Sequence, residues 1–310
     1  MKIRAVEKML QDHLRARPLR AKSLVVTVFG DAIAPHGGAI WLGGLIRLLA
    51  SFGINERAVR TTVFRLTREH WLRGEQVGRR SHYTLTESGR RRFETAFRKI
   101  YGADRGAWDG RWCLVIESGE RLSGPKRKAL REELAWTGFG RIAAGVLAHP
   151  TIDAESVAAI LAEHRAEPHV LVMHATHDTG LDATALGNAI RSAWNLARLE
   201  RDYRAFLERF TPVLTALEKY AARDLDPEQC FMVRTLLIHE YRRVILRDPL
   251  LPDELLPREW PGSGARKLCR DLYRATQRLT EQHLVATLQT PDGALPQAAG
   301  YFYSRFGGLT

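Results

Sequence analysis

The sequence GINERAVRTTVFRLTR, from Gly53 to Arg68, predicts a helix with two chemically different faces. Asn55 is suited to cap the first turn, and Glu56 follows where the helix dipole favours a carboxylate. Small apolar side chains recur at helical spacing on one face. These are Ala58, Val59, Thr62, Val63 and Leu66. The opposite face is cationic and carries Arg57, Arg60, Thr61, Arg65 and Arg68.

The flanking segments predict a helix-turn-helix with a wing. An apolar helix from Trp41 to Leu49 precedes Gly53, which suits the sharp turn of this motif. After the cationic helix, Gln76 to Thr86 reads as a hairpin with a basic tip. In the winged motif the helix enters a major groove and the wing touches DNA backbone or minor groove. The predicted DNA-binding residues are Arg57, Arg60, Thr61, Arg65, Arg68, Arg79, Arg80 and His82.

Phe64 departs from the pattern because it falls among the arginines at 3.6 residues per turn. Two interpretations are open. The ring covers the edge of the small core, or it makes an apolar contact with a thymine methyl group.

The charge distribution supports a polyanionic partner. Residues 1–105 contain 21 Lys and Arg against 9 Asp and Glu, whereas residues 106–310 contain 26 of each sign. The whole formal charge of +12 therefore lies in the first third of the chain. An excess confined to one region is typical of nucleic-acid binding. We predict that residues 1–105 form a DNA-binding domain.

The remaining two thirds predict two further domains. Residues 106–180 alternate strand and helix patterns in the order βαββαβ, beginning with a strand from Arg111 to Glu117 and ending with one near His169 to His174. This order predicts a ferredoxin-like sandwich, whose edge strands could pair with a second copy. Residues 181–310 predict an all-α domain, in which Pro212 should kink or split a long helix. The fold class is therefore α+β and multidomain.

Other classes of protein find little support in the sequence. No segment approaches the roughly 18 apolar residues of a membrane span, and no apolar signal-peptide core is present. Three scattered cysteines fit a reducing cytoplasm better than a disulfide framework or a zinc site. No catalytic or cofactor motif is found. We expect a cytoplasmic protein without a metal or cofactor, and not an enzyme.

Several motifs resemble the PaaX family of transcriptional repressors of phenylacetic acid degradation. They are Ile40–Leu72, GRRSHYTLTESG from Gly78, WDGRW at Trp108–Trp112, LIHEYRRVILRDPLLPDELLPREWPG at Leu237–Gly262, and the closing YFYSRFGGL. The resemblance covers nearly all of the chain from about Ser23. It implies a DNA-binding domain, a central ferredoxin-like dimerisation domain, and a helical C-terminal domain. It also implies that phenylacetyl-CoA is the effector that releases the repressor from its operator.

The sequence suggests a hypothesis for the effector site. A CoA thioester needs cations for its phosphates beside an apolar pocket. His239, Tyr241, Arg242 and Arg243 share one predicted helix, and the proline-broken segment that follows could bring Trp260 near it. The predicted effector-binding residues are His239, Arg242, Arg243 and Trp260. Alternatively, Arg242 and Arg243 pair with Asp248, Asp253 or Glu254 and hold the loop.

Two functions from different classes follow. The first is a homodimeric, effector-responsive repressor that binds a double-stranded DNA operator. The second is a metal-dependent nuclease built on the ferredoxin-like segment. The second has less support, because Asp109 and Glu117 bracket the first strand about eight residues apart and so do not form a cluster of carboxylates.

Overall fold

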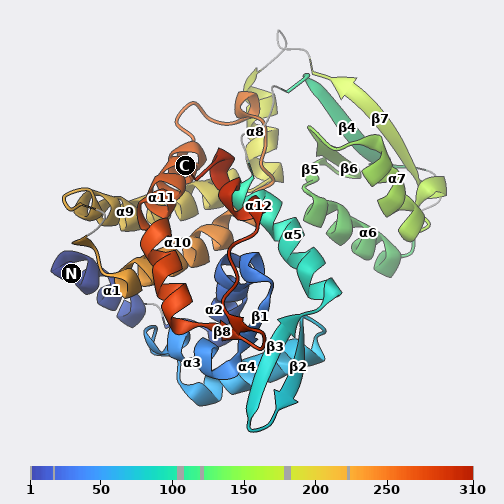
Figure 1. Cartoon of the computed structure of the whole chain (residues 1–310). Helices are drawn as coiled ribbons and strands as arrows, with labels where there is room; N and C mark the ends of the chain where they lie inside the picture. The colour runs from blue at the N-terminus through green and yellow to red at the C-terminus, as the bar shows by residue number, and fades with distance from the viewer. Residues whose placement is uncertain are drawn as a thin grey trace. The chain divides into compact units, whose positions relative to one another are not determined.

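The computed structural model of the chain describes residues 2–16, 18–102, 108–118, 122–177, 183–221 and 224–309. Contacts divide the chain into two compact units (Figure 1). Unit 1 comprises residues 1–104, 204–246 and 263–310, and unit 2 comprises residues 105–203 and 247–262. The domain boundaries predicted near residues 105 and 180 lie outside the described residues. No helix in the described part of the chain combines the length and apolar character that a membrane crossing requires.

The described residues in the N-terminal part of unit 1 form five α-helices and a small sheet. The elements are α1 (Arg4–Ala16), α2 (Ala21–Val28), β1 (Ala39–Trp41), α3 (Leu42–Ala50), α4 (Glu56–Arg68), β2 (Leu72–Val77), β3 (Arg80–Leu85) and α5 (Glu87–Tyr101). The sheet is antiparallel with the order β1-β3-β2. Helix α2 continues into a π-helical turn over Phe29–Ile33.

The C-terminal part of unit 1 packs on these elements. Its elements are most of α9 (Leu196–Leu217), α10 (Pro227–Ile245), most of α11 (Pro261–Thr287), β8 (Gln289–Thr290), β9 (Gly293–Ala294) and α12 (Gly300–Tyr303). Helix α10 is buried on nearly all sides and contacts α1, α2 and α5. The closing aromatic segment packs back onto the unit, since Phe302 and Arg305 are fully buried.

Unit 2 contains a four-stranded antiparallel sheet of order β5-β6-β4-β7 (Figure 1). The elements are β4 (Arg111–Glu117), α6 (Gly124–Thr137), β5 (Gly140–Ala143), β6 (Val146–His149), α7 (Ala154–Glu163) and β7 (Val170–Thr176). This is the βαββαβ order predicted from the sequence. Val115 of β4 packs with Leu130 and Leu134 of α6 and with Val157 of α7 in one core. The central sheet therefore forms around apolar residues shared by strands and helices.

Two helices follow the sheet in sequence, α8 (Ala183–Ala193) and α9 (Leu196–Leu217). The indole of Trp194 lies against Gly140, where a Cβ atom would come within 2.3 Å of the ring, so this contact requires glycine. Helix α9 runs through Pro212 without a break, so Pro212 does not split the helix. The chain breaks instead at Asn195, which adopts a left-handed φ of 48°.

Candidate nucleic-acid interface

Helix α4 forms as the sequence predicts. The Asn55 side chain accepts a hydrogen bond of 2.9 Å from the backbone N–H of Ala58, which caps the helix. Gly53 takes a left-handed φ of 73° in the turn that joins α3 to α4. Val59, Val63 and Leu66 are fully buried, and α4 contacts both α2 and α3. The apolar face of α4 is thereby fixed in the core, and its other face is left to solvent.

The solvent face of α4 is cationic and open. Its exposed residues are Arg57, Arg60, Thr61, Phe64, Arg65 and Arg68. Arg60 pairs with Glu56 at 2.7 Å, but both side chains are 57% exposed. Such surface pairs contribute at most about 1 kcal/mol, so Arg60 can exchange Glu56 for another anion at little cost.

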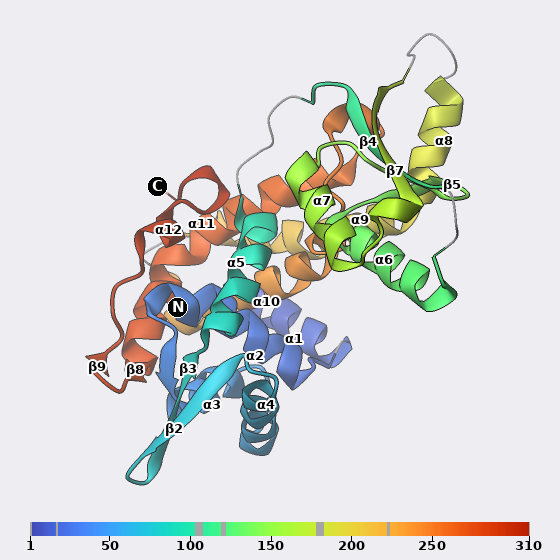
Figure 2. The ribbon, with the colours of Figure 1, turned by 90° about the vertical axis from the view of Figure 1, so that its right-hand side faces the viewer.

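The hairpin formed by β2 and β3 stands at the same end of unit 1 as α4 (Figure 2). The pairing runs from Leu72 opposite Leu85 to Val77 opposite Arg80. Gly78 turns the chain with a φ of 60°, and Arg79 and Arg80 are exposed at the tip. The Nε1–H of Trp41 donates to the carbonyl oxygen of Thr290 at 2.8 Å, which holds the indole in place. The Arg80 guanidinium lies 4.0 Å from the centroid of this Trp41 ring. This stacking orients Arg80 without consuming its hydrogen-bonding groups.

His82, predicted with them, does not lie among these exposed cations. Its side chain is 8% exposed and lies beside Glu75 at 3.3 Å. The physical reason is the register of the sheet, because Trp41 of β1 lies directly opposite His82 of β3 and covers it. Strand β1 does not extend as far as Arg80, which therefore stays open to solvent.

The predicted effector residues lie in two different places. On α10, the Nδ1 atom of His239 lies 3.0 Å from the Thr27 hydroxyl, and Arg242 donates to the Ser23 hydroxyl at 2.9 Å. Both contacts bind α10 to α2. Arg243 is 53% exposed and pairs with Glu240 at 3.1 Å. Trp260 belongs to unit 2, where its ring packs edge-on against Tyr203.

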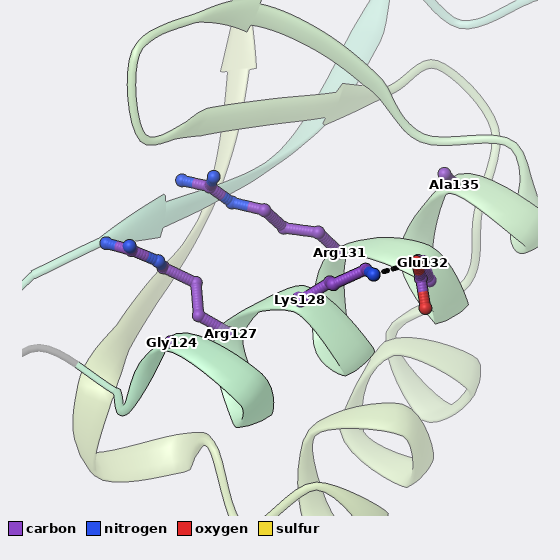
Figure 3. A pocket seen from close by; sticks show the side chains of 6 residues that line it. All are labelled: Gly124, Arg127, Lys128, Arg131, Glu132 and Ala135. Atoms are coloured by element: carbon purple, nitrogen blue, oxygen red, sulfur yellow. Dashed lines mark ion pairs between the residues drawn. The ribbon is translucent and has the colours of Figure 1, made fainter.

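Residues of α6 in unit 2 border a shallow groove with a volume of about 310 Å³ (Figure 3). Arg127, Lys128 and Arg131 supply its cations. Arg131 pairs with Glu117 at 2.7 Å, and Lys128 lies 3.8 Å from Glu132. Sequence reasoning did not single out this groove, because three cations on one exposed helix are ordinary for a protein surface.

Sequence reasoning also missed a buried ionic cluster in unit 1. The Asp31 carboxylate accepts from Arg234 at 2.9 Å and from Arg305 at 2.9 Å, and Arg234 also pairs with Glu281. Arg234 and Arg305 are both fully buried. One signal could have indicated the cluster, since Arg234 stands alone in the apolar run Cys230–Ile238.

Comparison with known proteins places the chain in a family. Three protein-family models match the chain. The model described as PaaX-like protein matches residues 20–89, PaaX protein central Cas2-like domain matches residues 105–186, and PaaX-like protein C-terminal domain matches residues 194–286. The Transcriptional repressor PaaX of Escherichia coli is 38% identical over 300 residues, which cover 97% of this chain and 94% of the relative. A solved structure, the uncharacterized protein Rv0674 from Mycobacterium tuberculosis, is similar at 26% identity with a TM-score of 0.48 over 76% of this chain and 88% of that one. On the identity to the Escherichia coli relative across nearly the whole of both sequences, the chain belongs to the PaaX family.

Proposed function

We propose that this protein is a transcriptional repressor of phenylacetate catabolic genes, released from its operator by phenylacetyl-CoA. Membership of the PaaX family supports the repressor role. One observation carries the proposal: the exposed arginine face of α4 stands at the same end of unit 1 as the exposed arginines of the β2–β3 tip. Two cationic elements so placed suit the major groove and the adjacent backbone of duplex DNA.

The DNA-binding part is proposed to be a winged helix-turn-helix. Its elements would be α2, β1, α3, α4 and the hairpin β2–β3. The pairing of β1 with β3 supports this, because it ties the hairpin to the helices instead of leaving it as a separate arm. In this proposal α4 is the recognition helix. Arg57, Arg60, Thr61 and Arg65 carry the base contacts, and Arg68 contacts a phosphate.

A footprint tests the function. Purified protein is expected to protect a defined sequence upstream of its own neighbouring genes, and phenylacetyl-CoA is expected to remove that protection. Arg60→Ala should lose ~1–3 kcal/mol of binding free energy at one base position. If Arg60→Ala bound the protected sequence normally while a change in the C-terminal helices abolished binding, the assignment of α4 would be wrong.

The nuclease alternative has a discriminating test in the same assay. In the structure, Glu117 pairs with Arg131, and Asp109 accepts a hydrogen bond of 2.9 Å from the backbone N–H of Arg111. Both carboxylates thus have structural partners. We expect specific binding without Mg²⁺- or Mn²⁺-dependent cleavage. Cleavage that disappeared in an Asp109→Asn variant would support the nuclease instead.

The wing gives a prediction about salt dependence. Replacing Arg79 and Arg80 by alanine should weaken binding to specific and random DNA alike, because an exposed guanidinium at a hairpin tip contacts backbone or a narrow minor groove. The slope of log affinity against log salt concentration should fall by ~0.9 for each lost phosphate contact. Arg73→Ala, on the outer strand of the same hairpin, is the matched control, since Arg73 pairs with Glu75. An unchanged slope in the double variant would contradict the prediction.

A homodimer through residues 108–178 is proposed, because one winged helix reads too few bases for an operator. Support comes from β7, an edge strand on which Leu171, Val172 and Met173 are 54%, 41% and 50% exposed. Light scattering at micromolar concentration should give twice the chain mass, and Val172→Lys should lower it. Val285→Lys is the control, because Val285 is 56% exposed on α11. A monomer that still bound a palindromic site tightly would defeat the proposal.

The effector site is proposed at His239, Arg242 and Arg243 of α10 in unit 1, and Trp260 of unit 2 is a separate candidate contact. Ligand contacts there could alter the α10–α2 interface, and α2 in turn packs on α4. Arg243→Ala or Trp260→Ala is expected to leave repression intact and to abolish the response to phenylacetyl-CoA. Arg242→Ala should also remove the response, although it removes the contact with Ser23 as well.

Calorimetry with phenylacetyl-CoA measures this directly. Arg127→Ala is the matched variant at the second candidate location, the groove bordered by α6. Normal affinity in the folded Arg243→Ala and Trp260→Ala variants would exclude the proposed site. Loss of affinity in Arg127→Ala alone would move the site to α6.

A further inference from the structure

Phe64 occupies the middle of the solvent face of α4 and is 61% exposed. At helical spacing its neighbours on that face are Arg57, Arg60, Thr61 and Arg68, all of them exposed. A phenyl ring of this exposure does not cover the edge of the core, so the structure rejects the first of its two sequence-based interpretations. The core beneath α4 is closed by Val59, Val63 and Leu66 without it.

The position of Phe64 matters more than its exposure. Single exposed apolar side chains are ordinary on protein surfaces and by themselves need no explanation. Here, however, the ring lies between cations of the one face that α4 presents to solvent. If that face enters a major groove, the ring is buried against base edges, whereas the flanking guanidiniums reach guanines and phosphates.

The chemistry of the groove identifies the partner of the ring. Among the atoms that base pairs present in the major groove, the C5-methyl group of thymine is the apolar one. A phenyl ring has no hydrogen-bonding group to offer to an adenine or a cytosine edge. We propose that Phe64 is a specificity-determining residue that contacts a thymine methyl group in the operator. This inference rests on the proposed function, since it requires α4 to be the recognition helix.

The expected effect is modest and confined to one position. Replacing a single thymine by deoxyuridine removes only its methyl group. Removing one apolar carbon from a buried contact should weaken binding about fourfold, which corresponds to ~0.8 kcal/mol. A Phe64→Ala variant should be indifferent to the same replacement, because the partner of the methyl group is already absent. Phe64→Leu should keep part of the discrimination, since an apolar side chain of similar reach remains.

The experiment begins by selecting the binding sequence itself. Duplexes that bind the full-length protein are selected from a randomised pool, and each thymine of the selected sequence is then replaced singly by deoxyuridine. Affinities are measured for the unchanged protein, Phe64→Ala and Phe64→Leu, with circular dichroism to confirm folding. The proposal expects one replacement per half-site to cost the unchanged protein about fourfold and to cost Phe64→Ala nothing.

The other outcomes distinguish a failure of the Phe64 contact from a failure of the repressor function. If every deoxyuridine duplex bound the unchanged protein equally, the role of Phe64 would be overturned while sequence-specific binding, and with it the proposed function, stood. If the pool yielded no preferred sequence, both would fall. If Phe64→Ala changed the mass found by light scattering and left the deoxyuridine profile unchanged, the ring would pack against a second copy, and the thymine contact would be overturned.

Discussion

Asp31→Ala is expected to lower the free energy of unfolding by about 3–5 kcal/mol, the cost of leaving buried charges without their partner. Oδ1 of Asp31 accepts from Tyr101 at 2.7 Å, from Tyr273 at 3.0 Å and from Arg305 at 2.9 Å, while Oδ2 accepts from Arg234 at 2.9 Å. The variant would remove the carboxylate that the fully buried Arg234 and Arg305 share, and would leave Arg234 paired with Glu281. Denaturation in urea, followed by circular dichroism, measures the loss.

Lys22→Ala is the matched control for this experiment. Lys22 pairs with Glu69 at 2.6 Å, but the two side chains are 46% and 43% exposed. Exposed pairs contribute at most about 1 kcal/mol, so this variant should be nearly as stable as the unchanged protein. Equal losses in the two variants would show that the buried cluster contributes no more than a surface pair.

The position of the cluster explains why its loss should destabilise several segments of unit 1. Asp31 lies in the π-helical turn after α2, Tyr101 ends α5, Arg234 lies on α10 and Arg305 lies near the end of the chain. Tyr273 of α11 also donates to this carboxylate, which thus joins five separate segments of the chain. Unfolding of the N-terminal helices should therefore be cooperative with unfolding of α10 and α11, and a single transition in unit 1 is expected.

Stability should also fall as the pH drops from 6.5 to 4, because of His239. Burial, reinforced by the neighbouring Arg242, lowers the pKa of His239 to about 4, whereas Glu240 opposes this shift. In the unfolded chain the imidazole takes up its proton near pH 6.5. Between these values the unfolded state binds more protons, so protonation favours unfolding. The neutral His239 contributes fully to the free energy of unfolding above pH 6.5. About 3 kcal/mol of that free energy should be lost by pH 4.

Unfolding curves for the unchanged protein and for His239→Asn isolate this contribution. The amide of asparagine does not titrate, so the difference between the two proteins should shrink steadily from pH 6.5 to pH 4. Glu281 affects stability at lower pH than His239 does. Burial raises the pKa of Glu281, but hydrogen bonds from His36 and Arg234 and the charge of Arg234 outweigh burial and lower this pKa to about 2. Its contribution should disappear only as the pH falls below about 4.5. If the unfolding free energies of the unchanged protein and of His239→Asn changed in parallel with pH, the assignment to His239 would be contradicted.

The sequence could predict those parts of the molecule whose signals are local. The cap by Asn55, the apolar spacing of α4 and the left-handed glycine before it depend on neighbouring residues, and all three are found in the structure. The strand from Arg111 to Glu117 is likewise found, because a run of apolar and aromatic residues indicates a buried strand without help from other segments. The exposed arginines of α4 follow from the same helical periodicity.

Only the tertiary structure decided how segments distant in sequence meet. His82 resembles Arg79 and Arg80 in sequence, but its burial depends on the register that places Trp41 opposite it. His239 and Arg242 read as candidate ligand contacts, yet their partners lie on α2, more than 200 residues earlier. The same holds for Asp31 and Arg305, which are separated by 274 residues. Local propensity sets helices, caps and turns within a few residues, whereas burial and charge pairing depend on which surfaces come together, and that is determined by the packing of the whole unit.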